Sequence, residues 1–204
     1  AVRPRLAEGR SILVCGAPSV LMEFSIGIVT FLYNVAVSRH GYGELGLAAY
    51  LIIGYLMLIL LTLFLGMAEG LQPVFSRFMA TGEEKRNLTM RRFSTKVFLG
   101  VGVISCLLIF LGSRWFFLLF APEDPELTAF AASRSIPYFC GFFLTGFNIL
   151  MISFLQATRQ TGRAMVLSLL RSVILPPALL LLLPALLGRE GVWVCQSAAD
   201  ALTA

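Results

Sequence analysis

Glu23 is the only charged side chain in a long apolar run that extends from Ser11 to Val37. A run of this length crosses a bilayer as a helix. A charged carboxylate near the bilayer centre costs roughly 3 kcal/mol on insertion scales, so an acid at that depth usually has a function. We therefore predict that Glu23 binds a proton or a cation in a transporter. The alternative is a protonated carboxylic acid that bonds a neighbouring helix, because burial favours the neutral form.

Neutral polar residues accompany Glu23 along the same segment at helical intervals, namely Ser19, Thr30 and Asn34. On a helix, these intervals place side chains on one face, and that face should contact protein or water rather than lipid. Asn148 lies in a similar series on a later apolar segment. We predict that these four neutral side chains supply oxygens around the carboxylate. The alternative for Asn148 is an ordinary hydrogen bond between two helices.

Two prolines are placed to bend the helices that carry acids. Pro18 lies one helical turn before Glu23, and Pro73 follows Glu69 near the end of the second apolar segment. Because proline has no backbone N–H, each leaves a carbonyl one turn earlier without its partner and permits a kink. Glu69 lies close to a basic connection, and we predict a structural or interfacial role for it.

The composition indicates a membrane protein. Hydrophobic residues make up 58% of the 204 residues, and charged residues only 13%, which is more apolar than soluble domains. Because about 20 apolar residues cross the hydrocarbon core, the sequence predicts an all-α polytopic transmembrane helix bundle. It has a cytoplasmic lead-in at 1–10 and one transmembrane unit at 11–204. The predicted elements are five full spans at about 11–38, 45–74, 95–119, 129–157 and 164–187, and a truncated sixth at 191–204.

Arginine and lysine are concentrated in alternate connections, which should therefore face the cytoplasm. A net charge of +5 is explained by this topology, so we predict a lipid bilayer as partner and no nucleic acid. The basic residues assigned to the cytoplasmic side are Arg3, Arg5, Arg10, Arg77, Lys85, Arg86, Arg91, Arg92, Lys96, Arg159 and Arg163.

The motifs of soluble enzymes are missing from the sequence. It has no phosphate-binding glycine loop with lysine, no histidine pair for a metal and no serine nucleophile elbow. We therefore predict no enzymatic activity and no cofactor beyond a coupling ion, H⁺ or Na⁺. Arg134 and Arg171 lie within predicted spans. We expect their charged ends to reach the headgroups, and the alternative is that they hold an anionic substrate or a lipid headgroup.

The second predicted span ends in the sequence Gly70-Leu71-Gln72-Pro73. This resembles the Gln-Pro motif at the end of the eighth helix in the multidrug and toxic compound extrusion (MATE) family. Three further segments are similar in order and spacing: 18–23 in a seventh helix, 155–157 at the end of a tenth and 191–193 at the start of a twelfth. The resemblance covers about 10–204, the C-terminal lobe of a twelve-helix transporter.

This resemblance implies a multi-pass antiporter of the inner (plasma) membrane. Such proteins export amphipathic, often cationic compounds in exchange for protons or sodium ions. Their two six-helix lobes enclose a central cavity, so the missing N-terminal lobe is an expected partner. Glu23 matches a seventh-helix glutamate that helps bind the coupling cation in part of the family. The sequence departs from the family at 76–82, and Thr145 and Asn148 occupy the region where some members carry an acid.

Two other functions fit the same segments. A lipid-linked oligosaccharide flippase of the same broader superfamily would use Arg134 and Arg171 to bind a pyrophosphate group. A membrane receptor or assembly subunit would bind a ligand without depending on an ion gradient. The unfinished sixth span predicts that the chain is a fragment or half of a larger protein.

Overall fold

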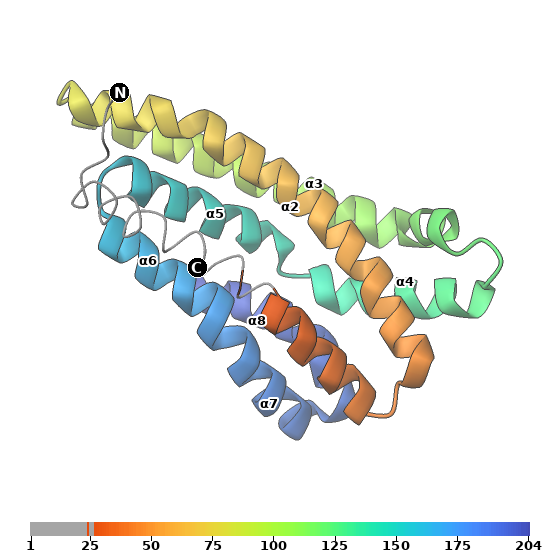
Figure 1. Ribbon diagram of the computed structural model, residues 1–204. Coiled ribbons are helices and arrows are strands. Elements are labelled where there is room, and N and C mark those ends of the chain that lie inside the picture. The colour runs from red at the N-terminus through yellow and green to blue at the C-terminus, as the bar shows by residue number, and fades with distance from the viewer. Residues whose placement is uncertain (1–23, 25–26) are drawn as a thin grey trace, which may run out of the picture.

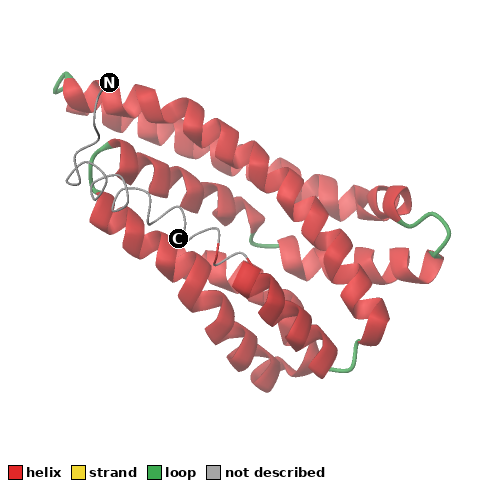
Figure 2. Cartoon of the chain, in the orientation of Figure 1, coloured by secondary structure: helices red, strands yellow, loops and turns green. Residues whose placement is uncertain are grey.

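The computed structural model describes residue 24 and residues 27–204, which form helices joined by short connections (Figures 1 and 2). The first helix is described over 27–39. The later elements are α2 (Gly43–Ala80), α3 (Glu84–Phe120), α4 (Pro125–Phe139), α5 (Phe142–Ala157), α6 (Thr161–Leu169), a π-helical turn η1 (Leu170–Ile174), α7 (Leu175–Leu187), a 3₁₀ turn η2 (Gly188–Glu190) and α8 (Gly191–Thr203).

The long helices α2 and α3 lie side by side along one edge of the molecule (Figure 1). Gly82 lies in the turn between them with φ of +70°, a conformation that glycine adopts without steric cost. The outer face of α3 carries large apolar side chains that are more than half exposed, which is the surface expected against lipid. These side chains are Leu107, Leu111, Trp115 and Leu119.

Helix α5 forms the centre of the fold, because it packs against α2, α3, α6 and α8. Two glycines permit its close approach to α2 and α3. A Cβ atom on Gly146 would lie 2.5 Å from the ring of Phe64, and one on Gly102 would lie 2.5 Å from the Cα of Phe143. Small residues at such contacts let helix backbones pack closely in membranes.

The predicted span at 129–157 is not one continuous helix. It is broken into α4 and α5, which meet at an angle of 49°. Gly141 lies at the break, and its N–H donates to Ser197 Oγ on α8 at 3.0 Å. Ser197 Oγ in turn donates to the carbonyl oxygen of Tyr138 at 2.8 Å. A helix can break at membrane depth where neighbouring protein bonds the freed backbone groups, and Ser197 does so here.

The predicted span at 164–187 contains a π-helical turn, which the periodicity did not indicate. Here the N–H of Leu175 bonds to the carbonyl oxygen of Leu170, five positions earlier. Pro176 and Pro177 follow directly. Neither proline can donate a backbone hydrogen bond, so the regular α-helical pattern cannot continue through this point.

Within the part of the chain that the structure describes, three helical stretches are long and apolar enough to cross a membrane, namely Gly43–Ala80, Glu84–Phe120 and Thr161–Thr203. The bent pair α4 and α5 provides a fourth. The first predicted span lies largely outside the described residues, so the number of five full spans with a truncated sixth stays a prediction.

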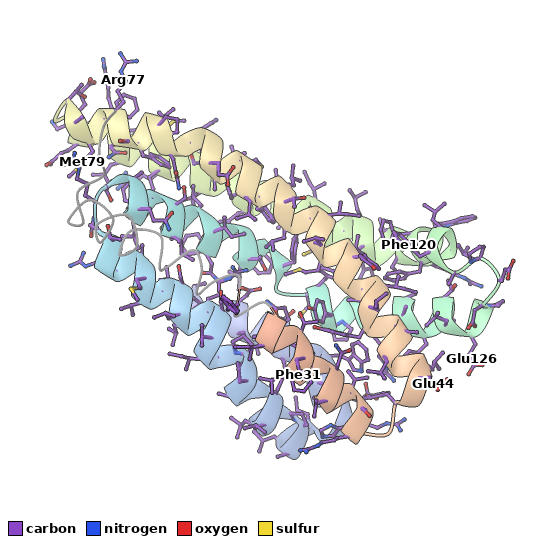
Figure 3. All side chains as sticks on the ribbon, in the orientation of Figure 1. Phe31, Glu44, Arg77, Met79, Phe120 and Glu126 are labelled. Atoms are coloured by element: carbon purple, nitrogen blue, oxygen red, sulfur yellow. The ribbon has the colours of Figure 1, made fainter. Side chains whose placement is uncertain are left out.

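Two of the connections that are predicted to be cytoplasmic can be located in the structure. The connections at 81–83 and 158–160 lie together at one end of the molecule (Figure 2). Figure 3 places Arg77 at this end, whereas Glu44 and Glu126 lie at the opposite end. The arrangement brings two of the predicted cytoplasmic connections to the same side.

Candidate functional site

Asp200 on α8 is a buried carboxylate that is bonded by side chains from three helical segments. Arg171 Nε donates to its Oδ1 at 2.7 Å, and Thr145 Oγ1 donates to its Oδ2 at 2.5 Å. Gln196 donates to Oδ2 at 3.2 Å, and Asn148 donates to the backbone oxygen of Asp200 at 2.9 Å. The Asp200 side chain is 1% exposed and that of Arg171 is 10% exposed. A charge at this depth persists when it is paired and fully hydrogen-bonded.

Arg171 belongs to the π-helical turn η1. Such turns insert an extra residue into a helix and are frequent at functional sites. The turn therefore changes the direction of the side chains around Arg171 relative to a regular helix. The expectation that Arg171 reaches the headgroups was wrong, because the guanidinium turns inward and pairs with Asp200.

A cavity of about 410 Å³ adjoins this ion pair, and apolar and aromatic side chains form most of its wall. Arg171 and Gln196, which both bond Asp200, belong to the wall. The cavity also receives residues from the first helix, α2, α4 and α5. Apolar walls with a few polar groups are typical of sites for small molecules.

Three tyrosines from different helices meet in this wall. Tyr33 stacks on Tyr50 with ring centroids 5.1 Å apart and an interplanar angle of 9°. The ring of Tyr138 meets that of Tyr33 edge-on at 6.2 Å. The Tyr33 hydroxyl is buried and has no hydrogen-bond partner among the described residues. The wall therefore contains three rings that pack mainly on one another, and a hydroxyl without a partner among the described residues.

The family-like motif residues lie at another part of the cavity. Gln72 on α2 donates through Nε2 to Oε1 of Gln156 on α5 at 3.2 Å. Glu69 joins both glutamines in the cavity wall and is exposed. The adjacent Pro73 does not interrupt α2, which runs as one helix from Gly43 to Ala80. The structure thus brings together two of the four segments that the sequence resemblance singled out.

A second charged cluster lies near the N-terminal ends of α2 and α8. Arg134 forms an ion pair with Glu190, and its guanidinium lies 5.1 Å from the ring centroid of Phe130. Tyr42 donates its hydroxyl hydrogen to the carbonyl oxygen of Arg189 at 3.0 Å. Burial raises the pKa of the Tyr42 phenol above its ordinary value, which keeps it a neutral donor. This cluster connects α4 to the α7–α8 turn.

The predicted coupling residues are only partly described. Ser19, Glu23 and Pro18 lie outside the described residues, so their predicted roles stay predictions. Thr30 lines the cavity. Asn34 donates through Nδ2 to the carbonyl oxygen of Thr30 at 3.0 Å, so its amide bonds its own helix. Asn148 is the remaining residue that was predicted to offer an oxygen to the coupling ion. Its Nδ2 donates to the backbone oxygen of Asp200.

Sequence reasoning missed Asp200. Its segment at 191–204 is too short to span a bilayer alone, so the pattern of apolar runs does not single out its acid. Two signals were available. Gln196 precedes Asp200 by one helical turn in an otherwise apolar segment, and Arg171 lies in another apolar segment. An isolated charge is costly in the membrane. A basic and an acidic residue in consecutive apolar segments therefore favour an ion pair between the two segments.

Comparisons with known proteins identify the fold. The family model MatE matches residues 18–180. No curated protein matches the chain. An inward-facing multidrug resistance MATE family transporter of the MOP superfamily aligns with a TM-score of 0.88 and 19% identity, covering 98% of this chain and 46% of that one. An outward-facing multidrug resistance MATE family transporter of the MOP superfamily aligns with a TM-score of 0.87 and 19% identity, covering 98% of this chain and 45% of that one.

Another similar structure is a MOP superfamily transporter from Pyrococcus furiosus, whose description states a reversed polarity of its binding pocket. It aligns with a TM-score of 0.86 and 18% identity over 98% of this chain and 45% of that one. The chain therefore spans less than half the length of these solved transporters.

Proposed function

The chain belongs to the MATE family, and from this premise we propose that it is the C-terminal lobe of a secondary active exporter. The complete protein exchanges amphipathic, often cationic compounds for protons or sodium ions across the inner membrane. Because the chain spans about 45% of its solved relatives, an N-terminal lobe is needed to complete the transport cavity.

The observation that carries this proposal is the cavity of about 410 Å³ beside α5. Its apolar wall suits the body of an amphipathic compound. Glu69 adds a carboxylate to the same wall. These groups match a lipophilic cation in both polarity and charge.

Coupling in this lobe is assigned to Glu23, with Ser19, Thr30, Asn34 and Asn148 as candidate oxygen ligands. Binding a proton or Na⁺ would remove the cost of a charged carboxylate in the membrane. A carrier built from two lobes can then favour the conformation that releases substrate outside. The position of Thr30 in the cavity wall supports a link between this helix and the substrate.

A lipid-linked oligosaccharide flippase receives less support. A pyrophosphate group needs cationic side chains whose charge is not already compensated. Arg134 pairs with Glu190 and Arg171 pairs with Asp200. Each of the two candidate arginines therefore has its own counter-charge.

The test is uptake of a lipophilic cationic dye into inverted vesicles that contain the full-length protein, under an imposed pH or Na⁺ gradient. We expect gradient-driven uptake, and we expect Glu23→Gln to abolish it. Glu44→Gln is the matched control, because Glu44 is exposed in the first turn of α2. If uptake is unchanged by Glu23→Gln, the residue that couples transport to the ion gradient must lie in the other lobe. Dye binding without uptake under either gradient would instead favour a receptor.

A further inference from the structure

The guanidinium of Arg171 is only partly used by Asp200. The carboxylate accepts from Nε, and the Arg171 side chain forms no other hydrogen bond within residues 24 and 27–204. An arginine has five N–H donors in one planar fork, so its terminal nitrogens remain available. Because Arg171 belongs to the cavity wall, these donors can reach a molecule bound in the cavity.

Tyr33 provides a second unused donor in the same wall. Its side chain is 1% exposed, and its hydroxyl has no partner among the described residues. Leaving a buried polar group unpaired is unfavourable, because the group has lost its hydrogen bonds to water. Because Tyr33 also lines the cavity, a ligand that offers a hydrogen-bond acceptor there would recover this cost.

From these two observations we propose that Arg171 and Tyr33 form a subsite for a carboxylate carried by the transported compound. The guanidinium fork matches a carboxylate in shape and charge. Asp200 is a positioning residue in this subsite, because its bond to Nε fixes the plane of the guanidinium. The inference rests on the proposed export function and deepens it by naming a group on the substrate.

The charges of the wall define the class of compound further. Arg171 is already compensated by Asp200, so a bound carboxylate needs a positive charge of its own nearby. An amphipathic compound with both a cationic aromatic body and a carboxylate brings that charge with it. Tyr33 and Tyr50 stack on each other, so the aromatic body of the compound lies against the apolar side chains of the cavity wall. A pyrophosphate group has no positive charge of its own, so it does not meet this requirement.

The test compares a rhodamine that has a free carboxylate with the methyl ester of the same dye. Uptake into inverted vesicles is measured with the full-length protein, and dye binding to the purified protein is measured by fluorescence anisotropy. Arg171→Lys keeps a cation opposite Asp200 but removes the planar fork. Tyr33→Phe removes only the hydroxyl. The matched controls are Arg163→Lys and Tyr55→Phe, because both parent residues are exposed and lie outside the cavity wall.

We expect Arg171→Lys to weaken binding of the carboxylate dye about tenfold and Tyr33→Phe to weaken it roughly threefold. Binding of the ester should change in neither variant, and the controls should match the wild type. Equal losses for both dyes, or no loss for either, would overturn the subsite. Failure of the wild type to transport both dyes would overturn the export function instead, and the anisotropy measurement would still decide the subsite.

Discussion

Arg171 and Asp200 are 29 positions apart in the sequence, yet Arg171 Nε lies 2.7 Å from Asp200 Oδ1 inside the helix bundle. The pair connects the π-helical turn η1 to α8, and Thr145 and Asn148 extend it to α5. Three helical segments that border the cavity are therefore fixed to one another by one carboxylate. A change at this pair should affect both the stability of the lobe and the shape of the cavity.

Replacing Asp200 with Asn should destabilise the protein, because it leaves the Arg171 cation buried without a counter-charge. We expect a loss of about 3–5 kcal/mol in the free energy of unfolding, measured on the full-length protein in detergent. The double variant with Arg171→Met and Asp200→Leu removes both charges and should recover most of the loss. A double variant that is less stable than Asp200→Asn would contradict this explanation.

Gly102→Ala should separate α3 from α5. The new Cβ would lie 2.5 Å from the Cα of Phe143, and a backbone atom cannot move aside as a flexible side chain can. We expect a loss of roughly 1–3 kcal/mol, visible as a lower midpoint of thermal unfolding. Gly100→Ala is the control on the same helix, since a Cβ there meets open space. Alanine is a better helix former than glycine, so Gly100→Ala should lose no stability, and an equal loss at both positions would contradict the packing explanation.

Ser197→Ala should weaken the junction between α4 and α5. The hydroxyl accepts from Gly141 N–H at 3.0 Å and donates to the Tyr138 carbonyl at 2.8 Å, so its removal leaves buried backbone groups unpaired. We expect a cost of about 1–3 kcal/mol and faster amide hydrogen exchange at the junction. Ser133→Ala should have little effect, because Ser133 is exposed and bonds a carbonyl of its own helix. Unchanged exchange at Gly141 in Ser197→Ala would refute the assignment.

The bond between Gln72 and Gln156 should couple α2 to the end of α5. In a double-mutant cycle with Gln72→Ala and Gln156→Ala, we expect a coupling free energy of about 0.6 kcal/mol, the average for side-chain hydrogen bonds between membrane helices. The measurement is reversible unfolding of the full-length protein in mixed micelles. Strictly additive losses would mean that the two amides do not interact in solution.

Several features of the fold followed directly from the sequence. The helices α2 and α3 coincide with apolar runs at 45–74 and 95–119 and extend beyond them into polar residues at the basic end. The motif residues Gln72 and Gln156 were singled out by the resemblance, and they meet in the cavity wall. The break at Gly141 was not predicted, because the bond that stabilises it comes from Ser197, on a segment 56 positions later.

Apolar runs and short motifs are local properties, so the helical membrane character of this chain and its place in the MATE family can be inferred without a structure. Which polar side chains meet, by contrast, depends on how the helices pack. Asp200 lies in a segment too short to attract attention, and Arg171 points inward through a π-helical turn before two prolines. Pairing of buried charges depends on which helices become neighbours and in which direction each side chain leaves its helix. Neither property is contained in the periodicity of a single segment.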